Sequence, residues 1–436
     1  MAEAAFARKS GRSASADAGG VAVRRRRATG RRVAPPLEHR ILTTAALCLL
    51  AFGAVMVYSA SSPLAVLSSG GGSGTGELIR YLAFGGVGLV AMQVLERRGL
   101  ALLTAQTCRL LLIGSFALLV LVLVPGFGVT VNGARRWFAA GPIQFQPSEL
   151  MKLALVLYSA RYLADHPKRM RRFREAVAPI VLAAGPALLL IVIEPDLGTA
   201  LVVAFTIFTL MIAAGMPMRY VGRLAAIVLA GVVLVVLVQP YQQQRLLSFL
   251  HPWAAATKAG PGYQAVQGQI ALGSGGLVGV GLGKSVQKIY YLPEANTDFI
   301  LAVIGEELGV LGICGVVCLY GMIAYAGLRT ARRAVGRYAK LVATGLTSLI
   351  LCQGILNIFV VLGLAPLTGV PLPFISYAPT NLCVMLASIG LLLNISRPGS
   401  RRLKVVARGG ASDRDRRRRD RGARRAGAGG RRRSTG

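Results

Sequence analysis

Asp298 is the residue of this sequence with the clearest potential for chemistry. It follows a Pro-Glu-Ala-Asn-Thr approach (293–297) and comes directly before a long apolar segment that begins at residue 299. A carboxylate at the mouth of a membrane helix is costly to keep there, and intramembrane ionisable residues are functional by default. We therefore expect Asp298 to have a functional role rather than a structural one.

The stretch GARRWFAAGPIQFQPSELMK (133–152) opens with three residues suited to a membrane surface. Arg135, Arg136 and Trp137 fit an interfacial segment, because basic side chains and an indole ring favour the level of the lipid headgroups. We expect this segment to lie at the interface, next to the helix that follows.

The end of the same stretch, PSELMK, predicts the start of a helix. Ser148 is expected to be its N-cap, and Glu149 in the first turn suits the helix dipole. Glu149 and Lys152 share one helix face at i,i+3. A local ion pair in a capped helix is one interpretation. A functional role is the other, because an unpaired ammonium about one turn into apolar surroundings is costly.

The turn EPDLGT (194–199) brings two carboxylates into six residues. Asp196 either caps the helix that follows it or forms an oxyacid cluster with Glu194. Such a cluster serves as a base or binds a hard cation. The sequence leaves both interpretations open.

A long glycine-rich loop covers residues 239–298. The basic residues of this loop are Arg245, Lys258, Lys284 and Lys288. Loops of this length are usually functional or disordered, and the aromatic, glycine and glutamine content favours an ordered, functional loop. The segment GVGLGKS (279–285) is not a P-loop, because the first glycine of that pattern is missing and no strand precedes it. Glycine backbone with Lys284 and Lys288 suits the phosphates of a lipid-linked substrate instead.

Membrane helices must position these residues. The chain has 436 residues, 54% hydrophobic and 15% charged, and its mean hydropathy is +0.58, which is typical of a polytopic membrane protein. Ten apolar runs are long enough to cross a bilayer. They lie near 41–60, 78–95, 108–125, 149–164, 177–193, 197–214, 221–238, 299–325, 341–363 and 381–396. The predicted fold is an all-α, ten-helix membrane domain over residues 41–396.

The distribution of charge predicts the orientation of these spans. Sixteen Lys/Arg lie in the loops at 96–109, 161–175, 215–223 and 329–340. By the positive-inside rule, these loops and both termini are cytoplasmic, and the long loop between spans seven and eight is extracytoplasmic. Seven acids then fall on or near the outer face. They are Glu149, Glu194, Asp196, Glu294, Asp298, Glu306 and Glu307.

Two basic tails account for most of the net charge of +33. Residues 1–40 carry ten Lys/Arg and three acidic residues. Residues 397–436 carry sixteen Lys/Arg and three acidic residues. Their composition predicts disordered cytoplasmic tails lying against anionic membrane lipids. Nucleic acid is not an expected partner, because no aromatic interleaving or module motif accompanies the charge.

Cysteine and histidine usage argues against a disulfide framework and a metal centre built from these residues. The six cysteines lie in or beside apolar segments and form no CxxC pair. The chain has only three histidines. Neither pattern predicts a zinc site.

The stretch PLTGVPLPFISYAPTNL (366–382) is too rich in proline to form a continuous helix. Irregular backbone at membrane depth is tolerated only where it lines a cavity or is buried in protein. Both arrangements fit a cavity that this stretch shares with the region of Asp298.

These stretches, in this order, resemble the SEDS family of bacterial wall synthases (FtsW, RodA, SpoVE) over roughly residues 40–397. The specific matches are GARRW, QPSELMK, EPDLGT, PFISY and QKIYYLPEANTDFILAVIGEELG. The form ALGSGGLVGVGLGKSVQK is closer to the FtsW division branch than to the RodA elongation branch. The resemblance implies a multi-pass protein of the bacterial cytoplasmic membrane that acts at the division septum.

The resemblance also implies an activity, a site and partners. The activity is polymerisation of lipid II into β-1,4-linked glycan strands outside the membrane. Asp298 matches the catalytic aspartate of the PE-x-x-TDF motif, and Glu149, Lys152 and Asp196 match positions around the same cavity. Glu306 is a further supporting position. The implied partners are a class B penicillin-binding protein transpeptidase and other divisome proteins.

The corresponding reaction joins the 4-hydroxyl of N-acetylglucosamine to C1 of N-acetylmuramic acid and expels undecaprenyl pyrophosphate. We expect Asp298 to be the general base. The leaving pyrophosphate needs positive charge or a metal. The candidate cations are Lys152, Arg135, Arg136 and Arg245. Glu149 and Asp196 either orient Lys152 or bind a divalent cation, Mg²⁺ or Mn²⁺; no organic cofactor is expected.

Two departures from the family pattern concern the outer cavity. Asn296 stands where the family usually has histidine, and Ala378-Pro379 stands where it usually has Gly-Gly. Proline restricts its own backbone and that of the preceding residue. The shape of that loop is therefore not expected to follow the family.

Two other functions remain open from the sequence. A lipid II flippase would place its functional charges at the membrane midplane, with access from both sides, whereas here the unusual acids gather on the outer face. A non-catalytic divisome scaffold would leave Lys152 and Asp298 unexplained.

Overall fold

A computed structural model describes residues 35–68, 75–131, 133–141, 143–167, 173–254, 257, 260–289 and 291–397. The chain divides into two units, Met1–Ala34 and Pro35–Gly436, and all described residues belong to the second. The predicted tails therefore lie almost entirely outside the described residues, as does Lys258.

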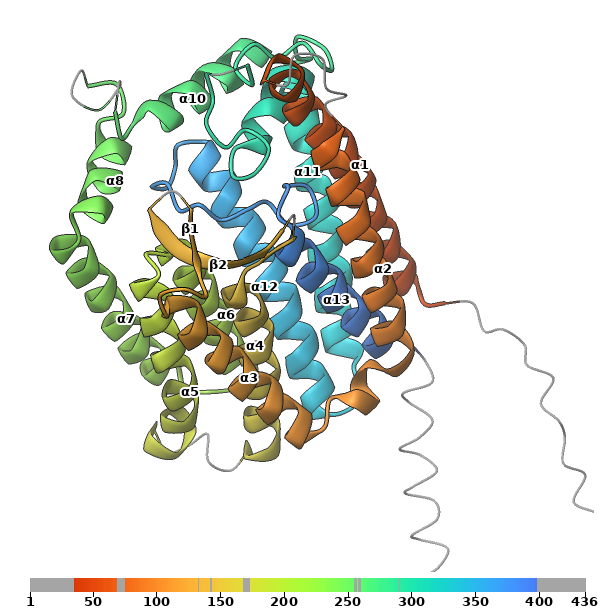
Figure 1. Cartoon of the computed structure of the whole chain (residues 1–436). Helices are drawn as coiled ribbons and strands as arrows, with labels where there is room; N and C mark the ends of the chain where they lie inside the picture. The colour runs from red at the N-terminus through yellow and green to blue at the C-terminus, as the bar shows by residue number, and fades with distance from the viewer. Residues whose placement is uncertain are drawn as a thin grey trace, which may run out of the picture. The chain divides into compact units, whose positions relative to one another are not determined.

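Helices make up nearly all of the regular structure (Figure 1). They are α1 (Leu37–Ser68), α2 (Gly76–Leu102), α3 (Ala105–Leu123), α4 (Pro147–Asp165), α5 (Phe173–Ile193), α6 (Leu197–Ala213), α7 (Met218–Val238), α8 (Pro240–Leu250), α10 (Tyr263–Gly275), α11 (Ile300–Arg333), α12 (Arg337–Val361) and α13 (Pro379–Ser396). The described part of the long loop is ordered, since it contains α8 and α10.

A small antiparallel sheet corrects the all-α prediction in one place. Its strands, in the order β1-β2-β3, are β1 (Val129–Val131), β2 (Ala134–Ala140) and β3 (Ile143–Phe145). The turns between the strands contain Gly133 and Gly141, which have φ values of 77° and 59°. Glycine adopts positive φ without strain, and tight hairpins require it. Most of the GARRW stretch therefore belongs to strand β2, and its position at the membrane interface stays a prediction.

The described helices show a multi-pass membrane protein. Seven of them are long and apolar enough to cross a bilayer, namely α1, α2, α3, α7, α11, α12 and α13. Helix α6 and residues Val177–Ile193 of α5 are apolar but shorter. Helix α4 has 19 residues and carries charged side chains at both ends. The number of ten spans stays a prediction.

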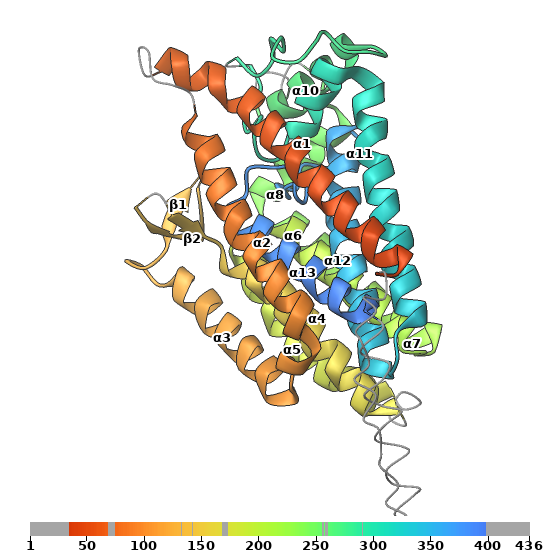
Figure 2. The same cartoon turned by 90° about the vertical axis from the view of Figure 1, so that its right-hand side faces the viewer.

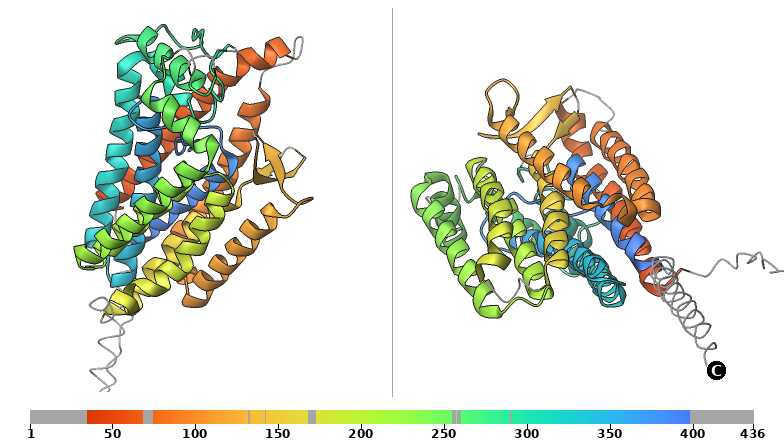
Figure 3. Two further views of the ribbon diagram at one scale, coloured as in Figure 1. Left: turned by 90° about the vertical axis from the view of Figure 1, so that its left-hand side faces the viewer. Right: turned by 90° about the horizontal axis from the view of Figure 1, so that it is seen from below.

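Helices α12 and α13 lie at the centre of the helix assembly. In their most apolar windows, 61% and 72% of residues are buried, against 6% in α7. Helix α13 packs along α2, α1 packs along α11, and α12 contacts α4, α6 and α11 (Figure 2). Helix α7 lies at the edge, next to α6 (Figure 3).

Helix α11 is interrupted near its first third. Gly309 has φ 67° and ψ −162°, and a Cβ there would lie 2.5 Å from the backbone of Leu277. The loop after α10 forms backbone hydrogen bonds with the interrupted helix. The donor and acceptor residues are Val280 to Glu306, Gly281 to Glu307, Val310 to Gly276 and Leu311 to Leu277. The loop is thus hydrogen-bonded to both sides of the interruption, to Glu306 and Glu307 before it and to Val310 and Leu311 after it.

Candidate active site

Asp298 is partly exposed and lies in the turn just before α11. Its backbone carbonyl accepts a 2.8 Å hydrogen bond from Asn357 Nδ2, on α12. The residue lines a cavity of about 20 Å³ together with Arg245, Gln264, Asn357 and Thr368. A cavity of this size holds about one water-sized group. The carboxylate therefore borders a confined polar space.

The surroundings of Asp298 raise the pKa of its carboxyl group to about 7. The residue as a whole is partly exposed, but its carboxyl group is withdrawn from water at the cavity, and this desolvation is the largest cause because it disfavours the charged form. The negative charge of Glu294 raises the pKa further, and the guanidinium of Arg245 opposes the shift. A base is most effective when its pKa lies near the working pH. The Asp298 carboxyl group therefore has the acidity of a general base that works near neutral pH.

The connection between α12 and α13, residues 362–378, forms the other wall of this cavity. Side-chain donors from four helices hold its carbonyl groups. They are Tyr81 of α2, Arg245 of α8, Tyr320 of α11, and Gln353 and Asn357 of α12. Ser376 Oγ donates to the carbonyl of Thr297 at 2.5 Å. Residues 367–370 and Asp298 line the same cavity, as the proline-rich stretch predicts.

Lys152 pairs with Glu149 inside the protein, as their i,i+3 spacing predicts. The Lys152 Nζ to Glu149 Oε1 distance is 2.8 Å, and both side chains are buried. Lys152 Nζ also donates to Gln353 Oε1 at 2.8 Å, and Gln353 Nε2 donates to the carbonyl of Pro371 at 3.0 Å. Asn381 Nδ2 donates to Glu149 Oε2. The Glu149–Lys152 ion pair thus orients the side-chain amide of Gln353, which supports the α12–α13 connection.

The predicted N-cap of α4 is wrong by two residues. Gln146 occupies the cap position and Pro147 follows in the first turn. Proline is favoured there because its missing N–H would have no helical partner. Ser148 is instead buried inside the first turn.

Asp196 caps α6, as one of its two interpretations predicts. Its Oδ1 accepts a 3.0 Å hydrogen bond from the amide of Thr199, and Gln146 Nε2 donates to Oδ2 at 3.3 Å. Arg136 donates to the carbonyls of Glu194 and Pro195, each at 2.6 Å. Arg136 therefore holds the EPDLGT turn in this structure.

Glu194 is a buried carboxyl group whose two oxygens find no hydrogen-bond partner in the part of the chain that the structure describes. Burial raises its pKa to about 8; the neighbouring Asp196 charge adds to the shift and Arg136 opposes it. At neutral pH the group is therefore largely protonated, which lowers the cost of keeping it away from water.

The two remaining predicted residues of strand β2 border this turn from the sheet. Arg135 donates to the carbonyl of Leu123 at 3.3 Å, and Trp137 is half-buried and pairs with Val129 of β1. Both belong to the support of the sheet, and neither lines the Asp298 cavity.

The basic residues of the long loop have different surroundings. Lys284 is exposed. Lys288 is fully buried, and its Nζ lies 2.7 Å from Glu307 Oε1 and 3.0 Å from Ser59 Oγ of α1. Glu306 accepts hydrogen bonds from Ser285 Oγ and from the amide of Val286. Lys288 and Glu306 thus fasten the loop to α1 and α11, and contact of Lys288 with substrate phosphates stays a prediction.

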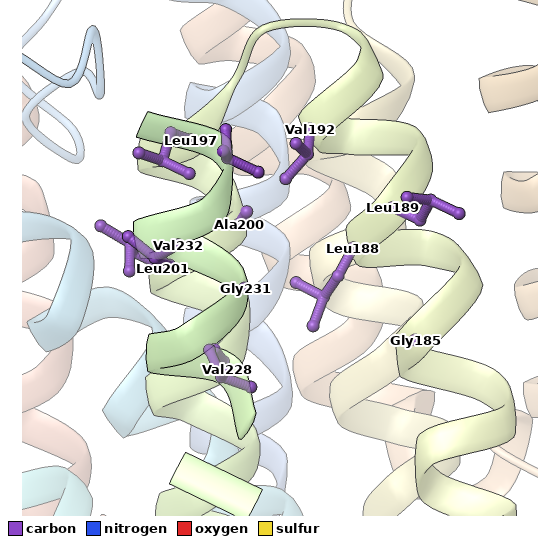
Figure 4. Close-up of a pocket in the computed structure, with 12 residues that line it drawn as sticks. Gly185, Leu188, Leu189, Val192, Leu197, Ala200, Leu201, Val228, Gly231 and Val232 are labelled. Carbon is purple, nitrogen blue, oxygen red and sulfur yellow. The ribbon is translucent and has the colours of Figure 1, made fainter. Parts of the chain in front are cut away.

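A second cavity lies between α5, α6 and α7 and has a volume of about 250 Å³. Figure 4 shows its lining, which includes Leu188, Val192, Leu197, Val228 and Val232. All lining residues are Leu, Val, Ala or Gly. They offer no group for acid–base chemistry, in contrast to the lining of the Asp298 cavity.

Five polar residues of the site were not among the predicted ones. They are Gln264, Gln353, Asn357, Thr368 and Asn381. Three of them lie within or beside apolar spans, and buried amides are costly unless they are hydrogen-bonded. A search for isolated amides in the predicted spans would have found Gln353, Asn357 and Asn381. Thr368 carries no such signal, because threonine is common in loops.

The two departures from the family pattern, at Asn296 and at Ala378-Pro379, lie near the start of α13 and the segment before Asp298. Asn296 Nδ2 donates to Glu77 Oε2 of α2, and its carbonyl accepts from the amide of Tyr377 at 2.9 Å. Ala378 is the N-cap of α13 and Pro379 its first residue, where proline is well tolerated. Asn296 and Tyr377 thus join the segment that precedes Asp298, residues 293–297, to the residues just before α13.

The comparison with protein families decides the identity of the chain. Residues 39–401 match the FtsW/RodA/SpoVE family, described as cell cycle protein. The chain belongs to this family. Stage V sporulation protein E of Bacillus subtilis (strain 168) is 40% identical over 370 residues, which cover 85% of this chain and 99% of that protein. A probable peptidoglycan glycosyltransferase FtsW of Geobacter sp. (strain M18) is 36% identical over 82% of this chain and 96% of its own.

Solved structures of FtsW/RodA/SpoVE-like proteins have the same fold. A chain in a structure titled "Structural coordination of polymerization and crosslinking by a peptidoglycan synthase complex" aligns with a TM-score of 0.65 and 31% identity, over 82% of this chain and 96% of that chain. The rod shape determining protein RodA of Thermus thermophilus aligns with a TM-score of 0.60 and 29% identity, over 84% of this chain and 98% of its own.

Glu149 and Asp196, the predicted cation ligands, are hydrogen-bonded to protein groups in this structure. Glu149 accepts from Lys152 and Asn381, and Asp196 caps α6. Among the described residues, no group of three or more His, Cys, Asp or Glu side chains is arranged to hold a metal ion. Binding of a divalent cation by Glu149 and Asp196 stays a prediction.

Proposed function

We propose that this chain polymerises lipid II into β-1,4-linked glycan strands on the outer face of the cytoplasmic membrane, with Asp298 as its general base. It is a peptidoglycan glycosyltransferase of cell-wall synthesis, as its full-length relatives are named. The mechanism rests on two observations about the Asp298 carboxyl group. Its pKa is about 7, and its side chain borders a small polar cavity.

In the proposed reaction, Asp298 takes the proton of the 4-hydroxyl of an N-acetylglucosamine. That oxygen forms a bond with C1 of an N-acetylmuramic acid, while the bond from C1 to the pyrophosphate oxygen breaks. Undecaprenyl pyrophosphate leaves with the electron pair. An α-linked donor gives a β-linked product, so one inversion with one base suffices.

Arg245 is the best placed of the predicted cations to stabilise the leaving pyrophosphate. It lines the same cavity as Asp298 and donates to the carbonyl of Leu367 at its edge, whereas Lys152 is buried in an ion pair with Glu149 and Arg136 holds two carbonyls of the EPDLGT turn. A guanidinium group suits phosphate oxygens because it presents several donors in a fixed geometry. A divalent cation, Mg²⁺ or Mn²⁺, stays a prediction for the same role.

The topology that fits this function has ten spans over residues 41–396, both termini in the cytoplasm and the loop 239–298 outside. The tails, 1–40 and 397–436, then face anionic lipids. A class B penicillin-binding protein is the expected partner, since the structure of a similar chain is titled for a complex that coordinates polymerisation and crosslinking. The division septum is the expected location, because several relatives are named FtsW.

A polymerisation assay tests the proposed function. Purified protein in lipid vesicles is given lipid II, with and without its transpeptidase, and the products are separated on a gel. Glycan chains under either condition support the proposal. Absence of polymer under both conditions, together with transfer of lipid II across the vesicle bilayer, overturns it in favour of a flippase. Absence of both activities favours a scaffold.

The polymerisation rate should depend on pH through Asp298. Only the ionised carboxylate can accept a proton, and its pKa is about 7. We expect the rate per enzyme to fall roughly tenfold for each pH unit below the midpoint and to level off above it. The check is a rate profile at saturating lipid II from pH 5 to 9. A midpoint near 4, the ordinary value for aspartate, contradicts the assignment.

A further inference from the structure

Two buried polar atoms beside Asp298 have no hydrogen-bond partner among the described residues, Asn357 Oδ1 and Thr368 Oγ1. The side chains are almost fully buried, with Asn357 1% and Thr368 6% exposed. Both residues line the Asp298 cavity. Buried polar groups nearly always have a partner, and an unpaired one asks for an explanation. Two such groups around one cavity indicate a polar ligand.

The geometry of Asn357 leaves only its oxygen available. Its amide nitrogen donates to the backbone carbonyls of Asp298 and Val370, each at 2.8 Å. An amide NH₂ group has two hydrogens, so both are used and the plane of the amide is fixed. The remaining hydrogen-bonding capacity is that of Oδ1, which can only accept. Thr368 Oγ1 can both donate and accept.

The size of the cavity limits what can enter it. About 20 Å³ accommodates one hydroxyl group or one water molecule, and excludes a sugar ring or an acetamido group. A hydroxyl has one donor and two acceptor positions. It can donate to Asn357 Oδ1 and accept from Thr368 Oγ1, which gives both buried atoms a partner.

We propose that Asn357 and Thr368 bind the ring hydroxyl next to the attacking one on the acceptor sugar, which is the 3-hydroxyl of N-acetylglucosamine. This inference rests on the proposed function and names the acceptor subsite of the same cavity. Holding the 3-hydroxyl fixes the direction of the neighbouring 4-hydroxyl relative to Asp298. The contribution to the rate is orientation of the acceptor, which is effective because the reacting atoms must be aligned.

Thr368→Val is the sharpest test, because it removes the hydroxyl and keeps the branched shape. Thr368 Oγ1 has no partner within the described ranges of the chain, so the substitution breaks no hydrogen bond there and the melting temperature should not fall. With the full-length protein in vesicles, we expect kcat/KM for lipid II to fall roughly three- to tenfold, the loss of one hydrogen bond to the substrate. Thr368→Ser keeps the hydroxyl and should restore most of the activity.

A substrate without the 3-hydroxyl supplies the matching test. With the wild-type enzyme, 3-deoxy-N-acetylglucosamine lipid II as the acceptor should show a loss similar to that caused by Thr368→Val. When variant and deoxy acceptor are combined, no further loss is expected, because the same hydrogen bond is already absent. Losses that multiply, or a deoxy acceptor used as well as lipid II, overturn the proposal. So does a Thr368→Val enzyme with unchanged kcat/KM, which is the result expected if a water molecule occupies the cavity.

Asp298→Asn separates failure of this inference from failure of the proposed function. If Asp298→Asn stops polymerisation while Thr368→Val behaves as wild type, the acceptor subsite is wrong and the general base stands. If Asp298→Asn polymerises lipid II at the normal rate, the proposed mechanism fails, and the subsite with it.

Discussion

Replacement of Asp298 by asparagine is expected to stop glycan polymerisation almost completely. The amide has the size of the carboxylate but cannot accept a proton from the acceptor hydroxyl. General-base catalysis is typically worth about 10²–10⁴-fold, so the rate should fall by that factor. The measurement is the initial rate of glycan formation from lipid II by the purified variant. The fold should be unaffected, because the residue holds α12 through its backbone carbonyl.

Glu294→Gln is the matched control for this variant. The negative charge of Glu294 raises the pKa of the Asp298 carboxyl group, so removal of that charge should lower this pKa. The variant should keep its full rate at high pH, and the midpoint of the rate profile should move to lower pH. An Asp298→Asn enzyme with the normal rate would show that another group is the base.

A second large effect is expected when one member of the buried Lys288–Glu307 pair is removed. The two side chains are fully buried and 2.7 Å apart, and Ser59 Oγ donates to Glu307 at 2.7 Å. Lys288→Met leaves a carboxylate in the interior without its counter-charge. Breaking a buried pair in this way typically costs about 3–5 kcal/mol. Thermal unfolding in detergent should show the loss as a lower melting temperature.

An exposed pair and a double variant serve as controls. Arg161 and Asp165 are 2.9 Å apart with 33% and 45% of their side chains exposed. Asp165→Asn should therefore cost under about 1 kcal/mol. In Lys288→Met/Glu307→Leu no unpaired charge remains, and much of the lost stability should return. The prediction fails if Lys288→Met costs no more than Asp165→Asn.

The helical part of the fold was predictable because its signals are local. A run of apolar residues marks a span wherever it lies, and the predicted span 341–363 corresponds to α12 (Arg337–Val361). The break at Gly309 was not predictable, because its hydrogen-bond partners come from a loop some thirty residues earlier in the chain. The small sheet escaped prediction for another reason. Strands β1 and β3 have three residues each, too few for a periodic pattern, and β2, ARRWFAA, shows no strict alternation of apolar and polar residues.

The same distinction applies to the site. The Glu149–Lys152 pair and the Asp196 cap depend on spacings of three residues, so the sequence offers each of them as one of two interpretations. The surroundings of Lys288 depend on Ser59, which lies 229 residues away in the chain. Lysine in a glycine-rich loop suggests a phosphate ligand, and only the tertiary structure reveals a buried carboxylate beside it. The role of Asn357 is equally hidden, because it depends on the carbonyl of Asp298.

The interruption of α11 has a mechanical consequence for the reacting carboxylate. A continuous helix would transmit a tilt or a shift of its membrane portion to Asp298 as a rigid rod does. Here Gly309 acts as a joint, and the short segment from Ile300 to Leu308 shares backbone hydrogen bonds with the loop 276–281. Because the same loop also accepts hydrogen bonds from Val310 and Leu311 after the interruption, a displacement of the loop is transmitted to both sides of Gly309. It reaches Asp298 through the short segment 300–308.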